Sequence, residues 1–174
     1  QEYLERLTDQ YGPCYIIPEG GSGPEGIRGC SEIVPEVINQ LGYRPDRWYV
    51  AAGTGGTAVG IAASLEGNEK VTAVSALREK VMFPEFSQAL NTLPEPDRSR
   101  VELDTSHHFG GMAKWTNELI QFMRAISDST GLPTDPIYTG KALYALVSEV
   151  IAGKFEPGDS VVFVHTGGAP GRLA

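Results

Sequence analysis

Short apolar runs alternate with segments of helical periodicity along the chain, and glycine or proline separates most of them. Residues 161–164 are uniformly apolar, which is typical of a strand buried on both faces. Residues 117–127 instead place Leu119, Met123 and Ile126 on one face of a helix. The pattern predicts strands at residues 13–18, 47–52, 70–76, 101–103 and 161–164, and helices at residues 2–11, 30–41, 57–65, 85–93, 117–127 and 139–152.

Local start and stop signals support these boundaries. Thr116 is a suitable N-cap for the helix that follows it, and Gly42 is a suitable end for the helix at residues 30–41. Pro35 must lie in the first turns of that helix or kink it, while residues 20–26 are rich in glycine and predict a loop. Strands that alternate with helices predict an α/β fold with three layers, a mostly parallel twisted sheet and helices on both faces.

Composition narrows the class of protein. The chain has 174 residues, of which 41% are hydrophobic, and this is enough for one α/β domain with a core. Its net charge of −8 argues against nucleic acid and anionic membrane as partners. No apolar run is long enough to span a bilayer, and the two cysteines, Cys14 and Cys30, make neither a disulfide framework nor a metal site. We therefore expect a cytoplasmic protein without a bound metal.

The glycine-rich turn at residues 53–57 carries the clearest chemical signal. It has the sequence GTGGT and lies between a predicted strand and a predicted helix. Glycine lets the backbone approach an anion, and the N–H groups at the helix start point toward it, so a phosphate is the natural ligand. A tight turn that needs glycine only for packing is the alternative. A dinucleotide is a further alternative, but the next strand ends at residues 74–77 without the carboxylate that would hold its ribose, and the first carboxylate after it is Glu79.

Three further motifs, taken with this turn, resemble a known family. The four motifs together resemble the D-cysteine desulfhydrase and 1-aminocyclopropane-1-carboxylate (ACC) deaminase family of fold-type II pyridoxal-phosphate (PLP) enzymes, which are similar to the tryptophan synthase β chain. They follow the family order and are PEGGSGPEGIRG at residues 18–29, GTGGT at residues 53–57, DPIYTGK at residues 135–141 and HTGGAPG at residues 165–171.

The resemblance implies PLP as cofactor and assigns roles by position. Tyr138 matches a catalytic tyrosine near the cofactor ring and the substrate, and Thr166 matches the residue beside the pyridine nitrogen. His108 and Phe109 fall in a segment near the substrate, although plain loop packing explains them equally well. The cofactor phosphate would be held by the backbone at Gly53, Thr54, Gly55, Gly56 and Thr57.

The resemblance also implies a substrate. ACC deaminases similar to this chain carry glutamate at the position of Thr139 and leucine at that of Thr166, whereas D-cysteine desulfhydrases carry small hydroxyl residues at both. The expected reaction is therefore D-cysteine plus water to pyruvate, ammonia and hydrogen sulfide. An ACC deaminase is one alternative, and a dinucleotide-binding domain or a non-catalytic phosphate-binding remnant is another.

The family's catalytic lysine has no match in this chain. Lys141 lies in the DPIYTGK motif, where the family lysine is not the catalytic one, and we expect it to be a structural or surface residue. We therefore expect residues 1–174 to be the C-terminal part of the PLP-binding large domain, without the lysine-bearing region and the smaller domain. Such a fragment is expected to be inactive alone and to belong to a homodimeric enzyme acting on a small amino acid.

Overall fold

Four parallel strands form one sheet in the computed structural model, which describes residues 2–15, 17 and 19–168. The strand order is β3-β2-β1-β4, so β1 is hydrogen-bonded on both sides. Trp48 of β1 lies opposite Val71 of β2 and opposite Val162 of β4. The strands are β1 (Arg47–Ala52), β2 (Lys70–Ser75), β3 (Val101–Asp104) and β4 (Val161–Val164).

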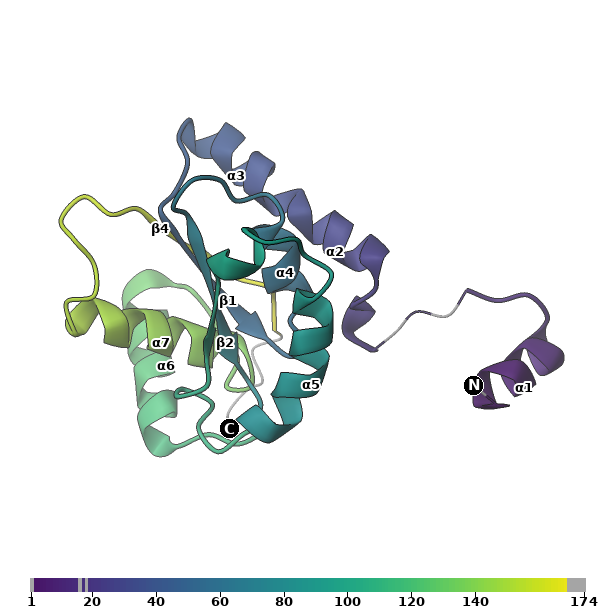
Figure 1. The fold of residues 1–174 in the computed structure, drawn as a ribbon. Coiled ribbons are helices and arrows are strands. Elements are labelled where there is room, and N and C mark those ends of the chain that lie inside the picture. Colours follow the sequence, from purple (N-terminus) through teal and green to yellow (C-terminus); the bar gives the residue numbers. More distant parts are fainter. Residues whose placement is uncertain (1, 16, 18, 169–174) are drawn as a thin grey trace.

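Helices cover both faces of this sheet (Figure 1), which confirms the predicted three-layer α/β fold. The first helix, α1, lies apart from the others in Figure 1. Two short 3-10 turns, η1 (Glu19–Gly21) and η2 (Arg98–Arg100), accompany the helices. The helices are α1 (Glu2–Tyr11), α2 (Pro24–Ser31), α3 (Ile33–Leu41), α4 (Gly56–Ala62), α5 (Glu79–Leu90), α6 (Asn117–Thr130) and α7 (Thr139–Ile151).

Alternate residues of β1 belong to two different hydrophobic cores, because side chains alternate across a strand. Trp48 and Val50 pack in the larger core with residues of α2, α3, α4 and α5. Tyr49 packs in the smaller core with Ala142 and Ala145 of α7. Residues 161–164, predicted as a strand buried on both faces, form β4 and contact both cores, but all four of its residues are only partly buried.

Two predictions for the first forty residues were wrong. The described part of residues 13–18 forms no strand, and Ile16 and Pro18 lie outside the described residues. The single helix predicted at residues 30–41 is two helices, α2 and α3, and α2 begins at Pro24 inside the predicted glycine-rich loop. Pro35 explains the break, since a proline cannot donate to the carbonyl four residues earlier. That carbonyl, on Ser31, instead accepts a hydrogen bond of 2.9 Å from the hydroxyl of Ser64.

Helix α4 packs closely against α2 through Gly60. A Cβ atom at Gly60 would lie 2.4 Å from Cys30 Cβ and 2.6 Å from the carbonyl oxygen of Ile27. Such distances are shorter than any van der Waals contact, so only glycine allows this helix spacing. The close packing fixes α4, and with it the turn at residues 53–57 that precedes the helix.

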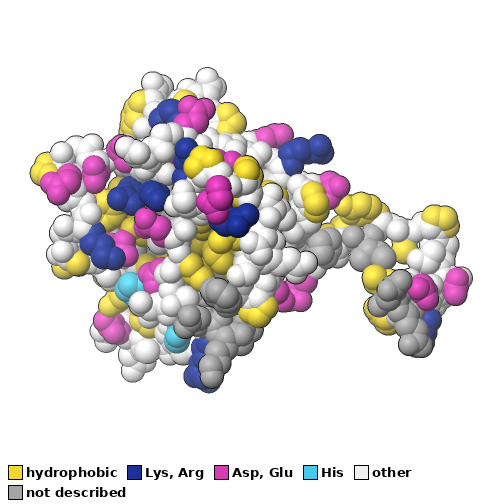
Figure 2. All heavy atoms as spheres, in the orientation of Figure 1, with side chains coloured by type: hydrophobic (Ala, Val, Ile, Leu, Met, Phe, Trp, Pro, Cys, Tyr) yellow, Lys and Arg dark blue, Asp and Glu magenta, His cyan; other side chains and the backbone are white. Residues whose placement is uncertain are grey.

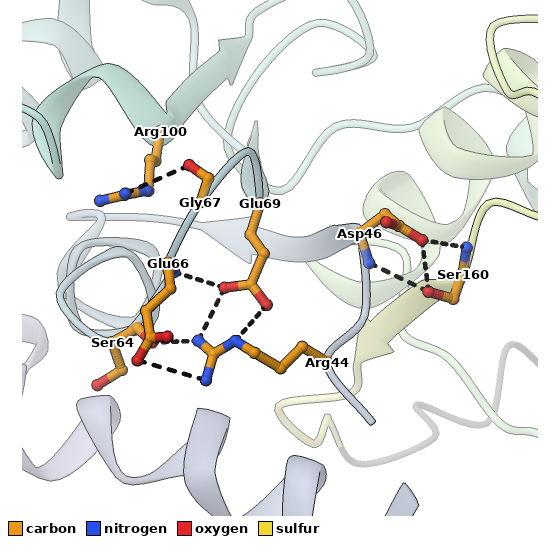
Figure 3. Close-up of polar contacts among 8 residues, drawn as sticks. All are labelled: Arg44, Asp46, Ser64, Glu66, Gly67, Glu69, Arg100 and Ser160. Atoms are coloured by element: carbon orange, nitrogen blue, oxygen red, sulfur yellow. Dashed lines mark hydrogen bonds and ion pairs between the residues drawn. The ribbon is translucent and has the colours of Figure 1, made fainter. Parts of the chain in front are cut away.

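Polar contacts hold the amino ends of the strands (Figure 3). The Arg44 guanidinium donates two hydrogen bonds to the Glu69 carboxylate, of 2.8 and 2.9 Å, and Glu69 is only 8% exposed. At the start of β4, Ser160 donates from its backbone N–H and its hydroxyl to Asp46, at 2.8 and 2.7 Å. These contacts link the segments that enter β1, β2 and β4 at the edge opposite the glycine-rich turn.

Charged side chains of both signs are interspersed on the face of the molecule shown in Figure 2. This face therefore shows no patch of a single sign, although the chain has a net charge of −8. Among the described residues, no helix is long and apolar enough to cross a membrane.

We predict that Gly60→Ala lowers the free energy of unfolding by about 2–3 kcal/mol, because the added methyl group meets the backbone of α2. The control is Gly29→Ala, which lies in α2 with nothing within 4 Å of its added Cβ. That change should be neutral or stabilise by up to about 1 kcal/mol. Urea unfolding of both variants measures the difference, and equal stabilities would contradict the close α2–α4 contact.

Candidate functional site

A pocket of about 600 Å³ opens at the carboxyl ends of the strands. The chain runs from β1 outward to β3 and then returns to place β4 on the other side of β1. Ligands of open α/β sheets bind outside the carboxyl ends of the strands at such a reversal of strand order. The lining residues come from seven segments and are Glu19, Gly20, residues 51–57, Leu77, Glu85, Met112, Tyr138 and Thr166.

The glycine-rich turn forms one wall of this pocket. Gly55 has φ +89° and precedes α4, and its added Cβ would lie 2.3 Å from the ring of Phe86. Within the part of the chain that the structure describes, no protein group accepts from the backbone N–H groups of residues 53–57. These donors lie at the start of α4, where the helix dipole favours negative charge. The turn therefore fits a phosphate, which would supply the missing acceptors.

Ser22 connects this turn to the preceding motif. Its hydroxyl forms a hydrogen bond with the Thr54 hydroxyl, and a Cβ at Gly20 would lie 2.6 Å from Thr54 Oγ1. Residues 18–29 and 53–57, which the sequence presents as separate motifs, thus meet beside one pocket. This hydrogen bond holds the Thr54 side chain beside the glycine-rich turn.

Tyr138 reaches the pocket from the N-terminal end of α7, and the Asp135 carboxylate organises this end. Asp135 accepts hydrogen bonds of 2.8 Å from the N–H groups of Ile137 and Tyr138, and of 3.0 Å from that of Thr139. The Thr139 hydroxyl donates a fourth, at 2.6 Å. Burial alone would raise the pKa of Asp135, but these hydrogen bonds outweigh it and hold the pKa below its usual range.

The Tyr138 side chain lies between Met112 and Gly53. Its hydroxyl donates to the sulfur of Met112 at 3.7 Å, and its ring would lie 3.5 Å from a Cβ at Gly53. Thr166, which follows β4, lines this pocket and a smaller one with Asp135 and Gly168. The pocket therefore brings together the glycine-rich turn, Tyr138 and Thr166, which were predicted as site residues from three separate motifs.

Three other predicted site residues lie elsewhere. Thr139 is fully buried against Asp135 and does not line the pocket. The His108 ring accepts a hydrogen bond from Gly110 N–H at 2.9 Å, and the Phe109 ring packs edge-on against Tyr144 at 5.0 Å. Neither of these two residues is in the pocket lining. Contact of all three with a substrate stays a prediction.

Sequence reasoning missed several lining residues, including Leu77, Glu85 and Met112. None of them belongs to a glycine motif, and each is a common residue type that carries no local signal. Met112 follows Gly110 and Gly111, whose φ angles are +98° and +106°. These glycines indicate a tight turn, but they do not indicate that Met112 lines a pocket. Tertiary folding alone brings these residues to the strand ends.

Lysine is missing from the described lining of the pocket. Lys141 was expected to be structural or at the surface; the structure excludes the surface alternative, because Lys141 is fully buried. Lys154 pairs with Glu149 at 2.7 Å, and Lys70 donates to the carbonyl of Ser99. Within the described ranges, no group of three His, Cys, Asp or Glu side chains could hold a metal ion.

The fold and this pocket define an α/β protein with a phosphate-binding turn at a reversal of strand order. Residues 1–167 match the family described as "Pyridoxal-phosphate dependent enzyme", so the chain belongs to the PLP-dependent enzymes. This match favours the phosphate of PLP over the dinucleotide that the glycine spacing left open. It also agrees with the family resemblance inferred from the four motifs.

Individual relatives point to one branch of this family. The chain is 36% identical to the bifunctional D-cysteine desulfhydrase/1-aminocyclopropane-1-carboxylate deaminase, mitochondrial, of Arabidopsis thaliana, over 96% of this chain and 44% of that protein. It is 29% identical to the 1-aminocyclopropane-1-carboxylate deaminase of Burkholderia ambifaria, over 100% of this chain and 56% of that protein.

A solved structure supports the same branch. The crystal structure of an ACC deaminase homologue matches with a TM-score of 0.79 at 32% identity, over 98% of this chain and 54% of that chain. The chain thus spans about half the length of the curated relatives it matches.

We predict that Asp135→Ala lowers the free energy of unfolding by about 3 kcal/mol, because three backbone N–H groups and one hydroxyl lose their acceptor. Asp135→Asn should cost less, since it retains an acceptor oxygen. The control Asp128→Ala removes an exposed aspartate of α6 and should change stability by less than about 0.5 kcal/mol.

The stability contributed by the Asp135 charge should also depend on pH. Its lowered pKa means that this contribution is complete above about pH 4, the usual range of a free aspartate, and is lost as the pH falls through the folded-state value. The stability difference between the unmodified protein and Asp135→Asn should therefore narrow on acidification. Denaturant unfolding between pH 3 and 7 measures it, and a difference that widens toward acid would contradict the assigned hydrogen bonds.

Proposed function

We propose that this chain carries the phosphate-binding part of a PLP-dependent lyase or deaminase acting on a small amino acid, with D-cysteine as the favoured substrate. One observation carries the proposal: the unpaired N–H groups of the glycine-rich turn, the Tyr138 ring and Thr166 line the same pocket at the strand ends. PLP has a phosphate at one end and a pyridine ring at the other, and these residues suit the two ends.

The proposed role of each residue combines its chemistry with the position that the family resemblance gives it. The N–H groups of residues 53–57 would donate to the phosphate, and the hydroxyls of Thr54 and Thr57 would add neutral donors. The Thr166 hydroxyl would bond the pyridine nitrogen. Tyr138, held by the Asp135 cap, would orient the substrate beside the ring. When bound, PLP supplies the electron-withdrawing ring that makes bonds at the α-carbon of an amino acid labile.

D-Cysteine is favoured over ACC because this chain carries Thr139 and Thr166, as the resembling D-cysteine desulfhydrases carry small hydroxyl residues, whereas the ACC deaminases carry glutamate and leucine there. The Thr166 hydroxyl would be a neutral, weak partner for the ring nitrogen, whereas a carboxylate beside that nitrogen would stabilise the protonated ring and make it a stronger electron acceptor. Elimination of sulfide from D-cysteine needs less electron withdrawal than opening a cyclopropane. Thr139 would contribute indirectly, since its hydroxyl completes the Asp135 cap that holds Tyr138. An ACC deaminase remains the alternative, and both activities appear in the names of the relatives.

The catalytic lysine is proposed to come from outside these 174 residues. The described lining of the pocket contains no lysine, and the buried amine of Lys141 already donates to two backbone carbonyls. The chain by itself is therefore expected to bind PLP without turning over an amino acid.

A homodimer and a cytoplasmic location are further proposals, both carried over from the sequence. The free state of Cys14 and Cys30 is compatible with a reducing compartment. Light scattering of the protein extended to the length of its relatives would give the oligomeric state, and a monomer would contradict the dimer.

The function is tested with the protein extended to the length of its relatives. We expect added PLP to produce a visible absorbance band, and D-cysteine to change this band and release sulfide. A response to ACC alone would show that the argument from Thr166 is wrong. Failure of the extended protein to bind PLP would overturn the proposed function.

A matched pair of glycine variants tests the turn itself. We predict that Gly55→Ala weakens PLP binding at least about tenfold, because its methyl group collides with Phe86 and changes the turn. Gly131→Ala is the control: Gly131 also has a positive φ, of 73°, but ends α6 with nothing within 4 Å of an added Cβ. It shares the backbone strain and should leave PLP binding unchanged. Equal loss in both variants would show that the turn has no special role.

A further inference from the structure

Lys141 is a buried lysine that forms no ion pair among the described residues. It lies in the first turn of α7 and its side chain has 0% exposure. Lysine is almost never fully buried unless its ammonium group is paired. Burial lowers the pKa of Lys141 to about 8, and the negative charge of Asp135 acts in the opposite direction. Burial of an ammonium group, which water hydrates strongly, costs free energy, so the position of Lys141 indicates a structural role.

The amine of Lys141 joins two segments that are distant in sequence. It donates to the carbonyl oxygen of Gly111 at 2.9 Å and to that of Ala76 at 3.4 Å. Ala76 directly follows β2, and its N–H donates to the carbonyl of Ala52 in β1 at 2.9 Å. Lys141 thus connects α7 to the carboxyl ends of two strands and to the segment at residues 105–116.

The contact with Gly111 lies directly beside the pocket. The next residue, Met112, lines the pocket, and its sulfur accepts from the Tyr138 hydroxyl. Tyr138 is the residue before α7, so the start of α7 contacts this segment twice. Lys141 contacts Gly111, and Tyr138 contacts Met112. Removal of the amine would leave the Gly111 and Ala76 carbonyls without this donor.

Gly111 also lies in a tight turn, in which both its N–H and its carbonyl are hydrogen-bonded. Its N–H donates to the carbonyl of His108 at 3.0 Å, and its own carbonyl accepts from Lys114 N–H at 3.1 Å as well as from Lys141. Arg78 holds the neighbouring Gly110 carbonyl from the surface side, at 2.9 Å. Lys141 therefore provides the interior attachment of this segment and Arg78 an exterior one.

We propose that Lys141 is a positioning residue, whose buried amine holds residues 105–116 against the end of β2 and thereby keeps Met112 beside the Tyr138 hydroxyl. Its effect on the segment is independent of any ligand. Its effect on PLP binding rests on the proposed function, because Met112 and Tyr138 line the pocket assigned to the cofactor.

The test is hydrogen–deuterium exchange of the 174-residue chain without ligand, comparing the unmodified protein with Lys141→Met. We expect the amides of Gly111 and Lys114 to exchange about tenfold faster or more in the variant, while the amides of β1 are unchanged. Lys154→Met is the matched control, since it removes an exposed lysine just after α7. It should leave exchange in residues 105–116 unchanged.

Two results would overturn the proposal. Unchanged exchange in residues 105–116 of Lys141→Met would show that the amine does not hold the segment. Equal acceleration in residues 105–116 and in β1 would show a role in general stability instead. If Lys141→Met does not fold, Lys141→Gln takes its place: its side chain is polar but one bond too short to reach both carbonyls, so the same criteria apply.

A PLP titration of the same variants, made in the protein extended to the length of its relatives, separates this inference from the proposed function. We expect Lys141→Met to raise the dissociation constant for PLP about fivefold or more and Lys154→Met to leave it unchanged. Failure of the unmodified protein to bind PLP would overturn the proposed function, and the exchange result would then decide the role of Lys141 alone. A fast-exchanging segment with unchanged PLP affinity would overturn the part of the proposal that concerns the pocket.

Discussion

The pocket depends above all on the pairing of β1 with β2 on one side and with β4 on the other. Parallel pairing brings the carboxyl ends of these strands to one edge, and the reversal of strand order beside β1 leaves room there for a ligand. The glycine-rich turn continues β1 and Thr166 follows β4, so both reach the same cavity. Parallel pairing thus makes neighbours of segments separated by more than a hundred residues in sequence.

Two charged groups near the start of α7 are buried close to this cavity. A buried charge is destabilising unless hydrogen bonds replace the water it has lost. Asp135 receives four such bonds and fixes the turn that carries Tyr138, whereas Lys141 gives two and connects the opposite wall. Through these hydrogen bonds, the N-terminal end of α7 connects Tyr138 with the end of β2 and with the segment that carries Met112.

The family relationship gives this arrangement its chemical meaning. A phosphate held by backbone N–H groups needs no charged side chain, which agrees with a pocket whose described lining has no lysine or arginine. In the proposed function, such a turn would hold the phosphate, which is the constant part of the cofactor. Thr166 and Tyr138 would then be the residues beside the ring.

The sequence by itself determined the fold class and much of the phosphate site, because both depend on local signals. The pattern of apolar residues predicted all four strands within a residue, and Thr116 correctly marked the start of α6 with its side-chain cap. The glycines of the turn at residues 53–57 predicted its place between a strand and a helix, since positive φ and close approach leave few other residue types. The strand expected at residues 13–18 was wrong, since local β propensity does not guarantee a pairing partner.

Only the tertiary structure decided which side chains face the pocket. Thr139 and Tyr138 are adjacent in sequence, but the Asp135 cap turns the first inward and leaves the second in the cavity. Pro35 interrupts the helical hydrogen bonding, and the Ser31 carbonyl that it leaves free accepts from Ser64, which is distant in sequence. Lys141 became a buried junction because its partners are carbonyls of two remote segments. Such contacts leave no local pattern, because their energy depends on what folding brings alongside.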